Sequence, residues 1–136
     1  MTSLWTRLPA IIIVSLVVAA CAMGAASGKP TLVEVWCGGD DALTLSLRDT
    51  LENAFKSSHD FSLGSGKKPG TLVVTIPTHV GWKHVHKRTQ VLYSVEFSSA
   101  DNKIFSTSTG SCWDDRLAKC AAQIVKEARI AVRKIH

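Results

Sequence analysis

The alternation of residues 88–98 is the feature that most restricts what this chain can fold into. Val91, Tyr93, Val95 and Phe97 are apolar, and the residues between them are mostly polar. Successive side chains of a strand point to opposite faces of a sheet, so this spacing predicts a strand with one buried face. A sheet built on such a strand needs a second layer to cover that face.

Two amphipathic segments can supply the covering layer. Gly38-Gly39-Asp40-Asp41 follows a predicted strand at Thr31–Cys37 and places a carboxylate at the N-cap of a helix over residues 42–57. A second helix is predicted to begin at Asp114 or Asp115. Further strands are expected at residues 71–78 and 104–109, with a short one at 61–63. The order β-α-β-β-β-α predicts an α+β fold, a mixed sheet with two helices packed on one face.

The first 28 residues have the pattern of an export signal. Arg7 precedes an apolar run over residues 10–20, and small residues follow it. Removing residues 1–28 leaves one domain at 29–136. Of the 136 residues, 46% are hydrophobic and 20% are charged, which excludes an intrinsically disordered chain.

Val18-Ala19-Ala20-Cys21 resembles a bacterial lipobox. The resemblance implies lipidation at Cys21 and a lipid anchor in a membrane. Ala22 in the following position implies the outer membrane, by similarity to Gram-negative sorting. Two alternatives stay open, namely ordinary cleavage after Ala22 or Ala26, which leaves a protein of the periplasm, and an uncleaved membrane anchor.

The predicted element order, the lipobox-like segment and the final amphipathic helix together resemble small envelope lipoproteins. The similarity is to the lipopolysaccharide-assembly lipoprotein and to the N-terminal domain of the Tol-Pal propeller protein. It covers most of the chain after the export segment as topology and includes no specific sequence motif. The resemblance implies a binding or assembly role in the bacterial cell envelope, and no functional residue is carried over from it.

Three cysteines remain after the export segment, Cys37, Cys112 and Cys120. In an oxidising compartment we expect one disulfide and one free thiol. The sequence leaves the pairing open. We favour Cys37–Cys112, because both residues end predicted strands that lead into helices.

Basic residues gather in the middle of the chain. Between Phe61 and Val95 there is no Asp or Glu, whereas the whole chain has a net charge of +5. Aromatic and basic side chains together suit anionic lipid, acidic polysaccharide or an acidic protein surface. The ligand-binding residues that we predict are Lys67, Lys68, Trp82, Lys83, His84, His86, Lys87 and Arg88.

No catalytic signature is found. The chain has no Gly-x-Ser-x-Gly or His-Glu-x-x-His motif, and the loop at residues 64–68 lacks the first Gly and the Ser or Thr of a phosphate loop. We therefore expect a protein that is not an enzyme, with no cofactor and no nucleic-acid partner.

The sequence favours an exported, non-catalytic envelope protein that binds an anionic component or a partner protein. Two alternatives are kept. One is a periplasmic inhibitor or immunity protein that blocks a hydrolase. The other is a periplasmic metal-binding protein that uses His84 and His86, although no metal site is predicted outright.

Overall fold

The computed structural model describes residues 28–135. The predicted export segment, with Arg7 and the lipidation candidate Cys21, lies outside this range. No helix of residues 28–135 is both long enough and apolar enough to cross a membrane.

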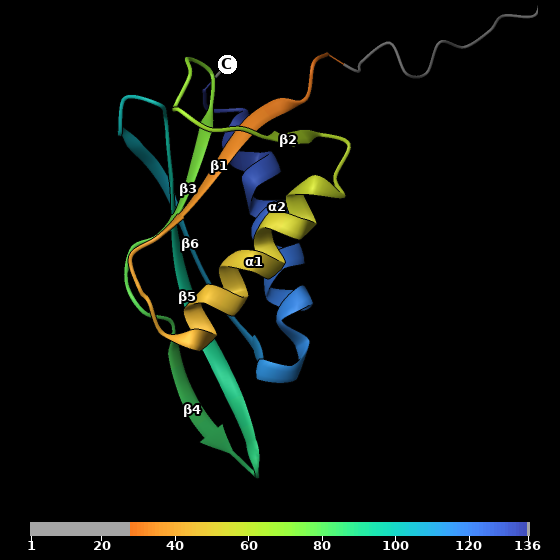
Figure 1. Ribbon diagram of the computed structural model, residues 1–136, viewed down its shortest axis with the longest axis vertical. Helices are drawn as coiled ribbons and strands as arrows, with labels where there is room; N and C mark the ends of the chain where they lie inside the picture. The colour runs from red at the N-terminus through yellow and green to blue at the C-terminus, as the bar shows by residue number, and fades with distance from the viewer. Residues whose placement is uncertain (1–27, 136) are drawn as a thin grey trace, which may run out of the picture.

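The predicted fold class is confirmed, because six strands form one mixed sheet and two helices pack against it (Figure 1). A 3-10 turn, η1, leads directly into the second helix. In chain order the elements are β1 (Thr31–Cys37), α1 (Ala42–Lys56), β2 (Phe61–Leu63), β3 (Leu72–Ile76), β4 (Gly81–Val85), β5 (Arg88–Ser98), β6 (Ile104–Trp113), η1 (Asp114–Arg116) and α2 (Leu117–Val132).

The long strand β5 organises the sheet. β1 pairs in parallel with both β2 and β3, and the pairings of β5 with β3, β4 and β6 are antiparallel. Phe97 is paired with Val74 on one side and with Ser106 on the other. β3 and β4 therefore follow one another along the same side of β5, and β6 occupies its other side.

Both helices lie on one face of this sheet (Figure 1). The alternating apolar residues of β5 point to that face and are at most 3% exposed. Leu47, Leu51 and Phe55 of α1 meet them in the core, together with Ala121 and Ile124 of α2. The amphipathic alternation that was read from the sequence thus sets the position of the helix layer.

The structure contains one substantial strand beyond the predicted order. β4 falls within residues 79–87, where a simple connection was expected, and β6 continues to Trp113, beyond the predicted end at residue 109. The alternation of apolar residues does not predict β4, because four of its five residues are exposed and it therefore lacks a buried apolar face.

The favoured disulfide is wrong. Cys112 is bonded to Cys120, with 5.6 Å between their Cα atoms, and Cys37 is a free thiol. η1 turns the chain so that the first helical turns of α2 pass back over the end of β6. Cys37 lies on β1, separated from β6 by β3 and β5. Three strand spacings amount to roughly 14 Å, which is too far for a disulfide.

Candidate binding site at the β4–β5 hairpin

The β4–β5 hairpin extends beyond the layer of helices at one end of the molecule (Figure 1). Its strands pair from Gly81 with Leu92 to Val85 with Arg88. Because no helix covers its end, the residues predicted to bind a ligand on this hairpin are all accessible.

His86 and Lys87 form the two-residue turn at the tip. Their φ angles are +48° and +65°, in the left-handed region that non-glycine residues rarely adopt. Two positive φ angles are typical of the turn that matches the twist of paired strands. The turn is therefore tight, and it presents an imidazole and the long basic side chain of Lys87 at the most distant point of the hairpin.

The two faces of the hairpin carry different chemistry. Trp82 pairs with the buried Val91, so Trp82 and His84 point to the same side of the sheet as the helices. Their rings meet edge to face, with centroids 5.2 Å apart, and the Trp82 side chain is 59% exposed. Lys83 lies on the opposite face, beside Gln90. One face thus offers an aromatic platform and the other offers a cation.

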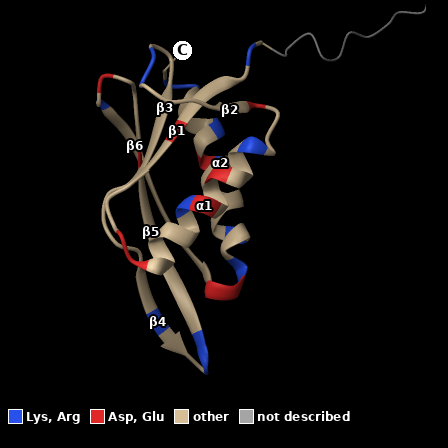
Figure 2. Ribbon diagram, viewed as in Figure 1, with Lys and Arg blue, Asp and Glu red and all other residues tan. Residues whose placement is uncertain are grey.

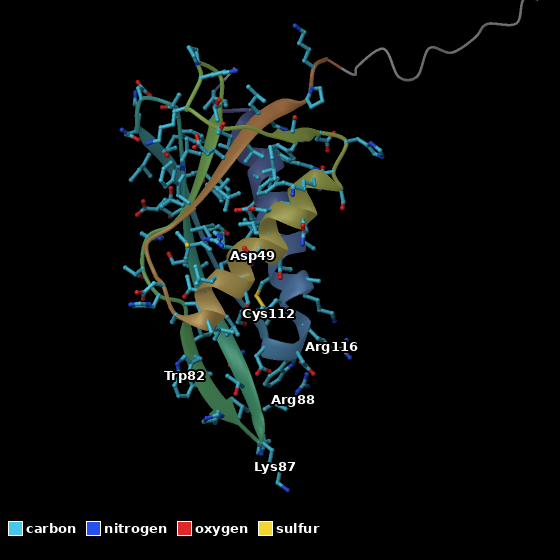
Figure 3. The ribbon with its side chains drawn as sticks, viewed as in Figure 1. Asp49, Trp82, Lys87, Arg88, Cys112 and Arg116 are labelled. Atoms are coloured by element: carbon cyan, nitrogen blue, oxygen red, sulfur yellow. A yellow bond between two sulfur atoms is a disulfide. The ribbon has the colours of Figure 1, made fainter. Side chains whose placement is uncertain are left out.

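Arg88 is held in place rather than free. Its guanidinium carbon lies 4.0 Å from the centre of the Trp113 ring, and its Nη2 atom is 3.3 Å from Oδ1 of Asp115. Figure 3 shows Arg88 at the base of the turn, between Lys87 and Arg116. Trp113 could not be predicted as a partner of Arg88, because the two residues are 25 positions apart and meet only when β5 and β6 pair.

The hairpin is positively charged throughout. Residues 81–90 contain Lys83, Lys87 and Arg88 and no acidic residue. Figure 2 shows these cations on β4 and at the tip, with the acidic residues of η1 on the neighbouring turn. Since Asp115 is already paired with Arg88, Lys83 and Lys87 are the two cations of the hairpin most open to a ligand.

Lys67 and Lys68 are not part of this site. They precede β3, at the end of the sheet opposite to the hairpin tip (Figure 1). Lys67 Nζ donates to Asn102 Oδ1 at 2.7 Å, in the turn between β5 and β6. β5 has 11 residues, which separates the two ends by roughly 30 Å. The predicted set of eight residues therefore divides into a hairpin group of six and a distant pair.

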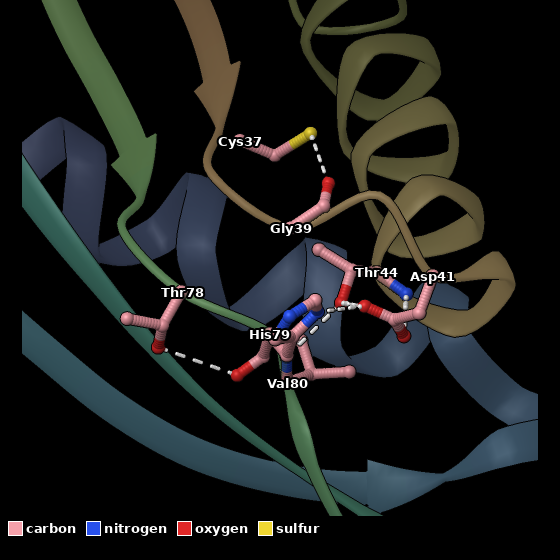
Figure 4. A network of polar contacts seen from close by, with 7 residues as sticks. All are labelled: Cys37, Gly39, Asp41, Thr44, Thr78, His79 and Val80. Carbon is pink, nitrogen blue, oxygen red and sulfur yellow. Dashed lines mark hydrogen bonds and ion pairs between the residues drawn. The ribbon is translucent and has the colours of Figure 1, made fainter.

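A polar network joins the base of the hairpin to α1 (Figure 4). Asp41 caps the helix by accepting from Thr44 N at 3.1 Å, and its other oxygen accepts from Thr44 Oγ1 at 2.6 Å. The same oxygen lies 2.6 Å from His79 Nδ1, and Val80 N donates to Thr44 Oγ1 at 3.0 Å. The segment that leads from β3 into β4 is thereby attached to the start of α1.

The network changes the proton affinities of its two ionisable members. Hydrogen bonds from Thr44 and His79 hold the pKa of Asp41 well below its usual range. The hydrogen bond and the charge of Asp41 raise the pKa of His79. The contact with Asp41 therefore favours the protonated form of His79 more than water does.

Glycine is required where β1 turns toward α1. A side chain on Gly38 would collide with the backbone carbonyl of Pro77, in the segment between β3 and β4. The close approach lets Gly38 N donate to Ile76 O at 2.7 Å. The connection at the base of the hairpin is thus packed against the β1–α1 turn.

His84 and His86 do not act as a pair. His84 lies on β4, with Nδ1 3.2 Å from Thr89 Oγ1, whereas His86 occupies the turn with its positive φ angle. Within residues 28–135, no three His, Cys, Asp or Glu side chains converge as metal ligands. The geometry offers electrostatic and aromatic contacts rather than a coordination sphere.

The fold and the hairpin together define an α+β protein with an exposed, basic, aromatic projection. Neither a comparison with protein-family models nor one with curated proteins finds a match. Among solved structures, the fold is similar to a minor lipoprotein from Acinetobacter baumannii. The identity is 12%, the alignment covers 71% of this chain and 89% of that chain, and the TM-score is 0.49.

Two PelC dodecamers from Paraburkholderia phytofirmans are also similar, each at 14% identity. One, a point variant, covers 69% of this chain and 79% of its own, with a TM-score of 0.45. The other covers 71% and 83%, with a TM-score of 0.44. These similarities concern the fold, and the interpretation of the site rests on the residues described above.

Proposed function

We propose that this chain is a non-catalytic protein of the bacterial cell envelope that binds an anionic membrane surface through the β4–β5 hairpin. One observation carries the proposal. Trp82 is exposed on one face of the hairpin, Lys83 is exposed on the other face and Lys87 lies at the tip, and residues 81–90 contain no acidic residue.

The chemistry of these side chains suits the boundary between lipid headgroups and water. Tryptophan favours that boundary because its ring is apolar and its indole N–H is polar. Each Lys or Arg near an anionic surface contributes about 1 kcal/mol of attraction. Lys83 and Lys87 take no part in the ion pair between Arg88 and Asp115, so both can approach headgroup phosphates.

The rest of the fold favours a rigid projection. The network of Asp41, Thr44 and His79 holds the base of the hairpin, and the stack of Arg88 on Trp113 braces one side. A binding element that is already ordered loses little conformational entropy when it meets its target.

Binding to vesicles tests this proposal. The full chain is mixed with vesicles of phosphatidylcholine alone or with added phosphatidylglycerol, and the bound fraction is measured at low and at high salt. We expect binding only to the anionic vesicles, and we expect salt to weaken it. Lys83→Glu with Lys87→Glu should reduce the affinity by about 30-fold or more, because about 2 kcal/mol of attraction is lost.

The opposite end of the molecule supplies the matched control. Lys56→Glu with Lys68→Glu changes the net charge by the same amount, at two exposed positions away from the hairpin. The control variant should keep most of the binding. An equal loss in both variants would mean that overall charge alone is responsible, and would overturn the assignment to the hairpin. An absence of binding at low salt would overturn the function.

Location in the envelope is proposed from residues 1–28. We infer that this segment exports the chain to the periplasm and that Cys21 carries a lipid anchor in the outer membrane. The mass of the intact protein from fractionated bacterial cells tests both steps. A membrane-bound species that begins at Cys21 with an added triacyl mass is the expected result. A soluble species that begins after Ala22 or Ala26 would contradict lipidation, an unprocessed chain in the membrane fraction would indicate an uncleaved anchor and would also contradict lipidation, and an unprocessed chain in the cytoplasmic fraction would contradict export.

A further inference from the structure

β6 is an edge strand with little of the usual protection against pairing with another chain, since the register shift in its pairing with β5 lies near its start, opposite Phe97 and Ser98. Within residues 28–135 it pairs with β5 alone, over nine registers. Its ten residues, Ile104–Trp113, include no charged residue and no proline. Natural edge strands are commonly short, charged or broken by proline, because an unpaired edge is a template for a further strand.

The other exposed edges of this sheet do have such protection. β2 has three residues, and β4 has five residues and carries Lys83 and His84. β6 is therefore longer than the edge strands β2 and β4, and unlike β4 it carries no charge. This difference needs its own explanation.

The charges that flank β6 indicate which strand would pair with its free edge. Lys103 precedes the strand, and Asp114 and Asp115 follow it. An antiparallel copy of the same strand reverses this order, so Lys103 of each chain would lie near Asp114 of the partner subunit. A register that places Thr109 opposite its own copy brings these ends together, because residue 104, which follows Lys103, and residue 114 are each five positions from 109.

The side chains of β6 suit the same register. Thr107, Thr109 and Ser111 are exposed and pair with Glu96, Ser94 and Leu92 of β5, so they share the sheet face that points away from the helices. Around a two-fold axis at Thr109, small hydroxyl side chains would face one another across the new pair. Cross-strand pairs of threonine and serine are favourable, whereas like charges at these positions would be repulsive.

The strand is also ready to pair without reordering. β5 fixes it along its length, and the Cys112–Cys120 disulfide ties its end to α2. A preformed edge reduces the entropy cost of association.

We propose that β6 pairs antiparallel with β6 of a second copy, around a two-fold axis at Thr109. The pairing joins two six-stranded sheets into one continuous sheet, and leaves both hairpins free. The proposal is independent of lipid binding, because it uses the strand and not the hairpin.

Charge reversal at the axis tests the proposal. The full chain in non-ionic detergent is examined by analytical ultracentrifugation. We expect a dimer for the wild type, and monomers for Thr109→Lys and for Thr109→Glu, since each variant places like charges opposite one another. An equimolar mixture of the two variants should form a dimer again, because the opposed charges are then of opposite sign.

Ser94 provides the matched control. It is exposed, and it pairs with Thr109 across β5 and β6, one strand inside the edge. Ser94→Lys and Ser94→Glu should dimerise as the wild type does. Circular dichroism should show that all four variants are folded.

Two results would overturn the proposal. One is a wild-type chain that stays monomeric up to about 100 μM, a concentration at which a pair of micromolar affinity is mostly associated. The other is a dimer that persists in both Thr109 variants, which would place the contact elsewhere in the chain. As a second measurement, the amide protection of residues 104–113 should rise with protein concentration, and a constant protection would contradict self-pairing.

Discussion

Asp41 and His79 meet with 2.6 Å between Oδ1 and Nδ1, although they are 38 positions apart in the sequence. Asp41 begins α1, and His79 lies in the segment between β3 and β4. One carboxylate therefore both caps a helix and fixes the base of the basic hairpin. The arrangement makes the stability of this region depend on pH.

We expect part of the stability to be lost as the pH rises through the pKa of His79 in the folded protein. The pKa of His79 is raised above 6.5 in the folded protein by its contact with Asp41. The protonated imidazole therefore contributes stability that is fully present below about pH 6.5 and is lost as the pH rises through the folded pKa. The contribution of Asp41 has the opposite pH dependence. Its pKa is lowered in the folded protein, so its contribution to stability is present near neutral pH and is lost in acid, as the pH falls through the folded pKa.

The variant His79→Gln tests this prediction. Between about pH 5.5 and pH 9, the melting temperature of the wild type should fall by more than that of the variant. His59→Gln, which changes an exposed imidazole after α1, should behave as the wild type does. A titration of His79 by NMR that gives a pKa at or below 6.5 would contradict the account.

Much of the fold could be predicted from local patterns. The alternation in β5 and the Asp41 cap of α1 are both properties of short segments, and both are confirmed. β4 could not be predicted in the same way. It has no buried face, and its turn uses His86 and Lys87 where Asn and Gly are the usual signal.

The disulfide and the division of the basic residues depend on tertiary structure. Cys112 and Cys120 meet because η1 tightens the entry to α2, which helical spacing alone does not predict. Lys67 and Lys83 are close in sequence, but β3 carries the chain away from the first toward the opposite end of the sheet. A basic stretch in the sequence is therefore two separate surfaces in space.

The tip turn offers a second prediction. A non-glycine residue in the left-handed region lowers the stability of the folded state by about 1–2 kcal/mol. His86 and Lys87 both lie in this region, so each contributes part of such a cost. His86→Asn with Lys87→Gly should therefore raise the free energy of unfolding by about 1 kcal/mol in a urea titration. Lys87→Ala, which shortens the side chain but keeps its Cβ atom, is the control and should give no such gain. A double variant no more stable than the control would argue against this turn geometry.

A third prediction concerns Tyr93 and Gly110, which are paired on β5 and β6. The Tyr93 hydroxyl is buried without a hydrogen-bond partner among the described residues, and a Cβ atom on Gly110 would collide with it. Gly110→Ala should cost about 1–3 kcal/mol of stability through overpacking. Tyr93→Phe should cost nothing, since no hydrogen bond is lost, and burial of an unpaired hydroxyl is itself unfavourable.

The two substitutions should also be coupled. Because the hydroxyl is the nearest obstacle, Gly110→Ala should cost less in the Tyr93→Phe background than in the wild type. Denaturation of the four proteins of this cycle gives the coupling energy. Strictly additive effects would mean that the Tyr93 hydroxyl is not the obstacle to a side chain at position 110.

The Cys112–Cys120 disulfide is the basis of a fourth prediction. It closes a loop with a sequence separation of 8, for which chain entropy gives a contribution of about 2–3 kcal/mol. Cys112→Ala with Cys120→Ala should lower the free energy of unfolding by about this amount. Cys37→Ala removes the free thiol and should have a smaller effect. Peptide mapping without reductant that links Cys37 to either of the others would contradict the pairing.

The most direct test of the central claim is an NMR titration of the full chain with anionic bicelles. The account predicts that the Trp82 indole signal, identified with Trp82→Phe, and the backbone amides of residues 82–88 change first. Signals of Lys67, Lys68 and Lys103 should stay in place, because these residues lie at the other end of the sheet. Changes centred on those lysines, or no change in the hairpin, would contradict the claim that the β4–β5 hairpin is the binding site.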